Sequence, residues 1–180
     1  MRPSLRWVVE AGAFGAVMLT ARASFADHYR VPTGSMEPTV HVDDHVLVEK
    51  AAYGLRVPLT TTWLLRYGGP RRGDVVIVDT GEPVVLLKRV AAIGGDVVAV
   101  RGGRVFLNGA PAEDPNAGLE AGGGPDFGPE RVPEGAVFVL GDNRGDSRDG
   151  RFFGFVAESR VLGRARAVVA RDGRPSYEPL

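Results

Sequence analysis

A series of short runs rich in valine and leucine follows Tyr29 and dictates what most of this chain can form. The runs occupy residues 45–50, 74–79, 84–92, 96–101, 104–108 and 136–140, and glycine, proline or aspartate flanks each of them. Apolar runs of this length, separated by turn residues, are typical of β-strands. The 25 glycines and 13 prolines of the 180-residue chain also favour turns and short strands over long helices. We therefore predict a mainly β domain over residues 27–180.

Three other segments refine this expectation. The sequence Arg-Gly-Gly-Arg at 101–104 lies between two of the runs and predicts a two-residue β-hairpin. Residues 111–135 contain five prolines and three consecutive glycines, which predicts a loop or a loosely built insertion. Residues 161–170 predict a final strand or a short helix.

The first 26 residues have a different character. Residues 7–20 are apolar apart from Glu10, and Arg2 and Arg6 precede them. A bilayer-spanning helix needs about 20 apolar residues, so a weak membrane anchor is one interpretation. A signal peptide cleaved after Ala26 and a core or interfacial helix are the alternatives. As an anchor, the segment would keep the N-terminus in the cytoplasm and place the β domain outside.

Composition excludes several classes of function. Lys and Arg total 22, as do Asp and Glu, so the chain lacks the basic charge that marks nucleic-acid binding. The absence of cysteine excludes disulfides, thiolate zinc sites and a cysteine nucleophile. A cluster of arginines near the C-terminus predicts either a solvated face or a contact with anionic lipid headgroups: Arg160, Arg164, Arg166, Arg171 and Arg174.

Histidines supply one set of candidate site residues. On a strand, His41, Asp43 and His45 would share one face and could bind a metal ion. The pair Asp43-Asp44 is equally typical of a solvated turn. A serine hydrolase with a histidine base is a further alternative, although the chain has no Gly-x-Ser-x-Gly motif.

Lys88 is a different kind of candidate, because Lys50 is the only other lysine. Lys88 lies in the apolar run Val-Val-Leu-Leu-Lys-Arg-Val, which predicts a buried strand. Burial disfavours the ammonium form and lowers its pKa, as a lysine general base requires. The alternative is a lysine on an edge strand whose amine reaches water.

Ser35 is the candidate nucleophile. Pro32 and Pro38 bracket it and Gly34 precedes it, which predicts a rigid turn. Thr33 is two residues earlier, so in an extended segment its hydroxyl would face the same side as Ser35. A nucleophile with an adjacent donor suits acyl transfer, whereas a simple Ser/Thr turn is the structural alternative.

A third polar segment, residues 141–151, alternates acids and arginines directly after an apolar run. An exposed charged turn would explain it, but so dense a mixture favours an ordered network of ion pairs. Four motifs then occur in order along the chain: Ser35-Met36-x-Pro38-Thr39, Arg72-Gly73-Asp74-Val75-Val76, Lys88-Arg89-x5-Gly95-Asp96 and Gly141-Asp142-Asn143-Arg144-x2-Ser147-x-Asp149-x-Arg151-x2-Gly154.

In these motifs the chain resembles the type I signal peptidases, or bacterial leader peptidases, from its N-terminus to about Val156. These are membrane-anchored serine proteases with a Ser/Lys dyad. The resemblance implies an antiparallel β catalytic core with a small variable insertion at about 97–135, preceded by a membrane helix within residues 1–26. It also implies a single-pass protein of the cell membrane with its N-terminus inside.

The resemblance assigns roles to individual residues. Ser35 matches the nucleophile and Lys88 the general base. The Thr33 hydroxyl and the Ser35 N–H match the oxyanion hole, and Ser147 matches the serine that orients the lysine. Four charged residues match structural ion-pair positions around the site: Arg89, Asp142, Asp149 and Arg151. Gly150 and Gly145-Asp146 depart from the family's usual Ser and Asp-Asn, and we expect both departures to loosen the loop around Ser147.

The activity implied is removal of N-terminal signal peptides from exported preproteins, with small residues at the third and first positions before the cut. The implied partners are these preproteins and membrane lipid, with no metal, cofactor or nucleic acid. A specialised maturation peptidase of a conjugation or secretion system would carry nearly the same motifs. A self-cleaving repressor shares the dyad but needs a helix-turn-helix, for which residues 1–28 are too short and too apolar. An inactive binding protein on the same fold is the remaining alternative.

Overall fold

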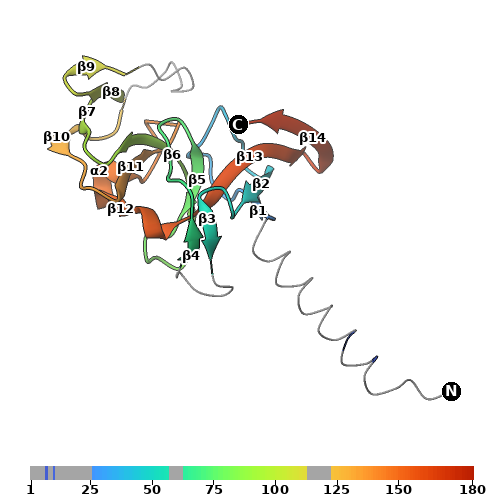
Figure 1. The fold of residues 1–180 in the computed structure, drawn as a ribbon. Helices are drawn as coiled ribbons and strands as arrows, with labels where there is room; N and C mark the ends of the chain where they lie inside the picture. Colours follow the sequence, from blue (N-terminus) through green and yellow to red (C-terminus); the bar gives the residue numbers. More distant parts are fainter. Residues whose placement is uncertain (1–6, 8–9, 11–25, 57–62, 113–122) are drawn as a thin grey trace.

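A computed structural model describes Trp7, Glu10 and residues 26–56, 63–112 and 123–180 of the chain. Within these residues β-strands predominate, and every strand pair is antiparallel (Figure 1). The mainly β prediction is therefore confirmed. Apart from the helical residues Trp7 and Glu10, the helices described are the single turn α2 (Gly150–Phe153) and the 3-10 turn η1 (Glu158–Arg160).

The larger sheet has eight strands in the order β1-β2-β13-β5-β6-β11-β12, and β14 pairs with the C-terminal part of β13. Its strands are β1 (Ala26–Arg30), β2 (His45–Glu49), β5 (Val75–Val78), β6 (Leu86–Ile93), β11 (Ala136–Leu140), β12 (Val156–Ala157), β13 (Val161–Arg171) and β14 (Arg174–Pro179). Strands β5, β6 and β11 lie in the interior of this sheet, and all the residues of β5 and β11 are buried. The near-continuous valine and leucine in these strands is the sequence signature of burial on both faces.

A four-stranded sheet, in the order β10-β7-β8-β9, is inserted between β6 and β11. It consists of β7 (Val97–Arg101), β8 (Arg104–Leu107), β9 (Ala110–Pro111) and β10 (Phe127–Arg131). Its apolar residues pack against Phe138 and Leu140 of the larger sheet in one shared core. A separate hairpin pairs β3 (Gly54–Arg56) with β4 (Trp63–Arg66).

Most of the predicted strands are present within one or two residues of their expected ends. The hairpin at 101–104 is confirmed, because Arg101 pairs with Arg104 and both central glycines have the positive φ that a type I′ turn requires. The short-helix alternative for 161–170 is wrong, since these residues lie within the long strand β13. The loop interpretation of 111–135 is wrong for Phe127–Arg131, which form β10.

The predicted membrane anchor and signal-peptide cleavage site fall almost wholly on residues 1–25. Apart from Trp7 and Glu10, these lie outside the described residues. Among the residues that are described, no helix has the length and apolar character needed to cross a membrane.

Candidate active site

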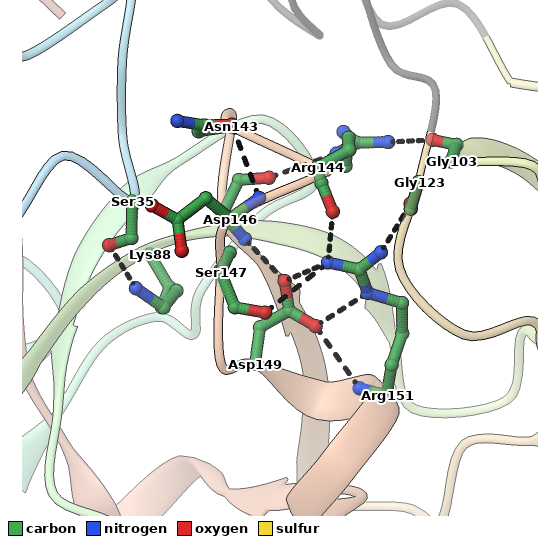
Figure 2. Close-up of polar contacts among 11 residues, drawn as sticks. Ser35, Lys88, Gly103, Gly123, Asn143, Arg144, Asp146, Ser147, Asp149 and Arg151 are labelled. Carbon is green, nitrogen blue, oxygen red and sulfur yellow. Dashed lines mark hydrogen bonds and ion pairs between the residues drawn. The ribbon is translucent and has the colours of Figure 1, made fainter.

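Strand β6 places Lys88 at the centre of the larger sheet. Lys88 pairs with Val76 of β5, and β11 covers the other edge of β6. Only 2% of Lys88 is exposed, so the edge-strand alternative is wrong. Its Nζ donates a hydrogen bond to Ser35 Oγ at 2.6 Å (Figure 2). The same Nζ donates to the Leu87 carbonyl at 3.0 Å.

Burial changes the acidity of this amine. Removal from water disfavours the ammonium form and lowers the pKa of Lys88 to about 8, against the smaller opposing effects of the Asp149 and Asp142 carboxylates. At that pKa the neutral amine is a substantial minority of the population near neutral pH, so Lys88 can accept a proton.

Ser35 is held in a turn between two buried anchors, Val31 and Met36. The Val31 N–H donates to the Asp44 carbonyl at 2.9 Å, and the Glu37 N–H donates to the Gly34 carbonyl at 3.0 Å. These contacts hold the shape of the turn, and the contact with Lys88 places it against β6. The Thr33 hydroxyl lies 3.4 Å from Ser35 Oγ, so the two hydroxyls do face the same side.

The histidines lie in other contacts. The His41 ring nitrogen Nε2 contacts the Pro38 carbonyl at 3.1 Å, and the His28 and His45 rings stack with centroids 5.8 Å apart. Across residues 26–56, 63–112 and 123–180, no group of three or more side chains is arranged to hold a metal ion. The predicted cluster of His41, Asp43 and His45 therefore does not assemble as a metal site.

A buried ion pair flanks the dyad. Arg89, next to Lys88, donates from Nε and Nη2 to the two oxygens of Asp142 at 2.8 and 2.7 Å. The Thr39 hydroxyl donates to the same carboxylate at 2.7 Å. Through Thr39, this ion pair joins the segment that follows Ser35 to the loop after β11.

A second ion pair organises the loop after β11. Asp149 is fully buried, caps α2, and accepts hydrogen bonds from Arg151 and from the Gly141 N–H. Arg151 also donates to the Arg144 carbonyl at 2.8 Å. The ordered network predicted for residues 141–151 is thus present, and the exposed-turn alternative is wrong for its buried members: Asp142, Arg144, Ser147, Asp149 and Arg151.

Ser147 is buried in this loop beside the dyad, but its hydroxyl has no hydrogen-bond partner among the described residues. The glycine at position 141 allows Ser147 to lie close to the turn that carries Ser35. A Cβ on Gly141 would lie within 2.5 Å of both the Ser147 Cβ and the Ser35 carbonyl oxygen, so only glycine fits between them. The hydrogen bond from Ser147 to Lys88 implied by the resemblance is absent from this arrangement.

The assembled groups are a hydroxyl, a buried amine of lowered pKa in direct contact with it, and a second hydroxyl beside it. Such a set can deprotonate the first hydroxyl and use it as a nucleophile in acyl transfer. The matching model of known families is the one described as signal peptidase, peptidase S26, which covers residues 4–170. This chain belongs to that family.

Members of this peptidase family are serine endopeptidases, and individual relatives agree with the assignment. A signal peptidase I from Leptolyngbya laminosa is 32% identical over 91% of this chain and 78% of its own length. One from Bacillus licheniformis is 33% identical over 90% of this chain and 86% of its own length. A solved signal peptidase I from Enterococcus faecalis is 29% identical, with a TM-score of 0.46, over 53% of this chain and 95% of that chain.

Several polar partners in this peptidase were not predicted. Asp96 pairs with Arg72, Asp74 accepts a hydrogen bond from Tyr53 at 2.8 Å, and Asp44 pairs with Arg171 at 2.8 Å. Three of the five clustered C-terminal arginines pair with acids in this way: Arg164 with Asp74, Arg166 with Glu49, and Arg171 with Asp44. The partners are far apart in sequence, and no spacing rule could have joined them.

Gly150, where the family usually has serine, lies against the aromatic core. A Cβ at this position would lie 2.7 Å from the Phe138 ring and 2.8 Å from the Val139 carbonyl oxygen. The Phe138 ring therefore occupies the space that a side chain at residue 150 would need. Gly145 and Asp146, the other departure, are exposed.

Proposed function

We propose that this peptidase removes signal peptides from exported preproteins with Ser35 as nucleophile and Lys88 as general base. The observation that supports these roles is the 2.6 Å contact between Lys88 Nζ and Ser35 Oγ within an apolar sheet interior. Desolvation there lowers the pKa of Lys88 to about 8, which supplies a neutral amine without a histidine or a metal ion.

The reaction follows from these positions. Ser35 Oγ attacks the carbonyl carbon at the cleavage site as its proton passes to Lys88 Nζ. The tetrahedral intermediate collapses, the C–N bond breaks, and Lys88 returns the proton to the departing amine. Lys88 then takes a proton from water as the water oxygen attacks the ester carbon. The second tetrahedral intermediate collapses, the bond from that carbon to Ser35 Oγ breaks, Lys88 returns the proton to Ser35 Oγ, and the signal peptide is released.

The negative oxygen of each tetrahedral intermediate needs donors. We assign this role to the Ser35 N–H and the Thr33 hydroxyl, which lies 3.4 Å from Ser35 Oγ. The family resemblance also supports small residues at the third and first positions before the cut. In this proposal the surrounding ion pairs hold the groups in place: Arg89 with Asp142, and Arg151 with Asp149.

Incubation of the full-length protein with an exported preprotein should release a fragment whose new N-terminus follows a small residue. A matched preprotein with leucine in place of that residue should stay intact, because a branched side chain does not fit a site shaped for alanine. N-terminal sequencing of the product checks both. Cleavage of the leucine preprotein at the same bond would contradict the proposed specificity.

Ser147 gives a prediction that separates catalysis from stability. We propose that its hydroxyl orients Lys88 when substrate is bound, although it has no partner in the free protein. Ser147→Ala should then lower kcat by roughly 10²-fold, the scale of a positioned proton-transfer group. It should not lower the melting temperature, because the alanine removes an unsatisfied buried hydroxyl. An unchanged kcat would exclude the orienting role.

We also propose that residues 1–26 anchor the protein in the cell membrane, with residues 27–180 as an extracytoplasmic catalytic domain that contains the inserted sheet. The arginines before the apolar stretch support this orientation. The exposed Arg160 and Arg174 could meet anionic lipid headgroups.

Protease added to spheroplasts should therefore digest the catalytic domain, since this orientation places it outside the membrane. Immunoblotting before and after detergent lysis measures this. Full protection until lysis would contradict the orientation, and a mature N-terminus at Asp27 would show that the segment is a cleaved signal peptide.

A further inference from the structure

The buried side chain of Arg144 connects the inserted four-stranded sheet to the loop beside the catalytic residues. Only 2% of Arg144 is exposed. Its Nη1 donates to the Gly103 carbonyl at 2.7 Å (Figure 2). Its Nε donates to the Gly141 carbonyl at 2.9 Å. Gly103 belongs to the β7–β8 hairpin, whereas Gly141 begins the loop after β11. One guanidinium thus joins the two sheets.

Asn143, which precedes Arg144 in the chain, holds the turn that carries Ser35. The Asn143 N–H donates to the Ser35 carbonyl at 3.2 Å, and the Asn143 side-chain amide donates to the Gly34 carbonyl at 3.2 Å. Because Asn143 and Arg144 are adjacent, the position of Ser35 depends on the same short stretch of backbone that Arg144 fixes to the hairpin.

The β7–β8 hairpin, which supplies the Gly103 carbonyl, is itself held in place by packing and hydrogen bonds. The inserted sheet shares a core with Phe138 and Leu140 of β11, and the Phe127 ring of β10 stacks on Phe138 with centroids 4.5 Å apart. Arg151 adds a second connection, from its Nη1 to the Gly123 carbonyl at 3.2 Å. Planar guanidinium groups suit this task, since their fixed donors reach two carbonyls at once.

We propose that Arg144 is a positioning residue, which uses the Gly103 carbonyl of the inserted sheet to hold Asn143 against Ser35. The inserted sheet is then a brace for the dyad and not a separate appendage. This inference rests on the proposed function for its kinetic consequence, because a displacement of about 1 Å at a reacting group can cost 10²-fold in rate.

Arg144→Met should lower kcat roughly 10- to 100-fold and leave KM within about twofold, because the substrate's binding surface is intact while Ser35 is misplaced. Arg144→Lys, which can reach one carbonyl, should recover part of the loss. Arg101→Met is the matched control. Arg101 also donates to carbonyls, those of Phe127 and Gly128, but these lie within the inserted sheet. Its loss should lower the melting temperature without a comparable fall in kcat.

A hairpin variant tests the other end of the contact. One glycine inserted after Gly102 displaces the Gly103 carbonyl and should reproduce the kcat loss of Arg144→Met. The double variant should lose no more than either single variant, because both remove one interaction. Additive losses would overturn the proposal, as would a kcat for Arg144→Met within twofold of wild type.

Hydrogen exchange gives a readout that does not need the cleavage assay. The Asn143 amide, which donates to Ser35, should exchange faster in Arg144→Met than in wild type or in Arg101→Met. If wild type failed to cleave preproteins, the proposed function would fail while this comparison still tested the brace. Equal exchange in all three proteins would overturn the brace itself.

Discussion

Replacing Lys88 with arginine should abolish preprotein cleavage as completely as replacing Ser35 with alanine. Arginine keeps the positive charge and most of the bulk of the side chain, but its guanidinium does not release a proton in proteins. Without a base, the Ser35 hydroxyl stays protonated. Lys50→Arg is the matched control, because Lys50 is the only other lysine and arginine can keep the ion pair that Lys50 forms with Asp27. Initial rates of the three variants on one preprotein measure this.

The same base sets the pH dependence. With the pKa of Lys88 at about 8, activity should rise with pH through a limb centred near that value. A lysine with its ordinary pKa of about 10.4 would offer roughly 200-fold less neutral amine at pH 7. A histidine base would instead place the limb near 6.5. An active Lys88→Arg protein, or loss of activity in a folded variant with His28, His41 and His45 all replaced by alanine, would contradict the dyad.

The free energy of unfolding should rise with pH from the same burial of Lys88. The folded protein releases the Lys88 proton near pH 8, whereas the unfolded chain keeps it until about 10.4. Between these values the unfolded chain binds more protons, so the contribution of Lys88 makes the free energy of unfolding rise with pH. The rise should be absent in Lys88→Met, which denaturant titrations at pH 7 and pH 10 can check.

Most strands of the larger sheet could be predicted from the sequence, because the interior strands are buried on both faces and therefore consist of apolar runs. Short valine-rich runs with turn residues at each end predict strands β5, β6 and β11. Each run is recognisable without knowledge of any other part of the chain. Strand β14 and the hairpin of β3 and β4 lack them. Their exposed or polar residues form strands only because a neighbouring strand supplies hydrogen bonds, and a single segment of sequence does not contain its partner.

The dyad candidates could be named from local sequence, but their contact could not. Ser35 was singled out by its turn and Lys88 by the apolar run around it, while the 2.6 Å contact depends on how that turn folds over β6. Family resemblance supplied the pairing. It also supplied a hydrogen bond from Ser147 that the free protein does not form, so a role taken from relatives still needs the geometry of this chain.

Buried charges were the least predictable part. Arg144 lies within one of the motifs, yet one of its acceptors is a backbone carbonyl 41 residues earlier in the chain. A carbonyl has no identity in the sequence, because every residue carries one. The same holds for the Gly123 carbonyl, which is one acceptor of Arg151, so the connection between the two sheets is visible only in the folded structure.

Replacing Arg89 with methionine should cause the largest loss of stability among single changes near the site. Asp142 is fully buried, and Arg89 supplies two of the hydrogen bonds to its carboxylate. Removing one partner of a buried ion pair leaves an uncompensated charge and costs about 3–5 kcal/mol. For a protein of this size that lowers the melting temperature by roughly 10 °C. Thermal unfolding followed by circular dichroism at pH 7 measures the change.

Two companion variants show whether the lone charge is the cause. Asp142→Asn added to Arg89→Met should restore part of the stability, since a neutral amide is cheaper to bury than a carboxylate. Arg148→Met breaks an ion pair with Glu82 whose side chains are 65% and 38% exposed, and such pairs contribute less than about 1 kcal/mol. Asp142 also lies close enough to raise the pKa of Lys88, and without Arg89 its charge should do so more strongly. The activity limb of Arg89→Met should therefore move to higher pH, and the added Asp142→Asn should reverse that shift. A melting temperature for Arg89→Met no lower than that of Arg148→Met would mean that Asp142 finds other compensation.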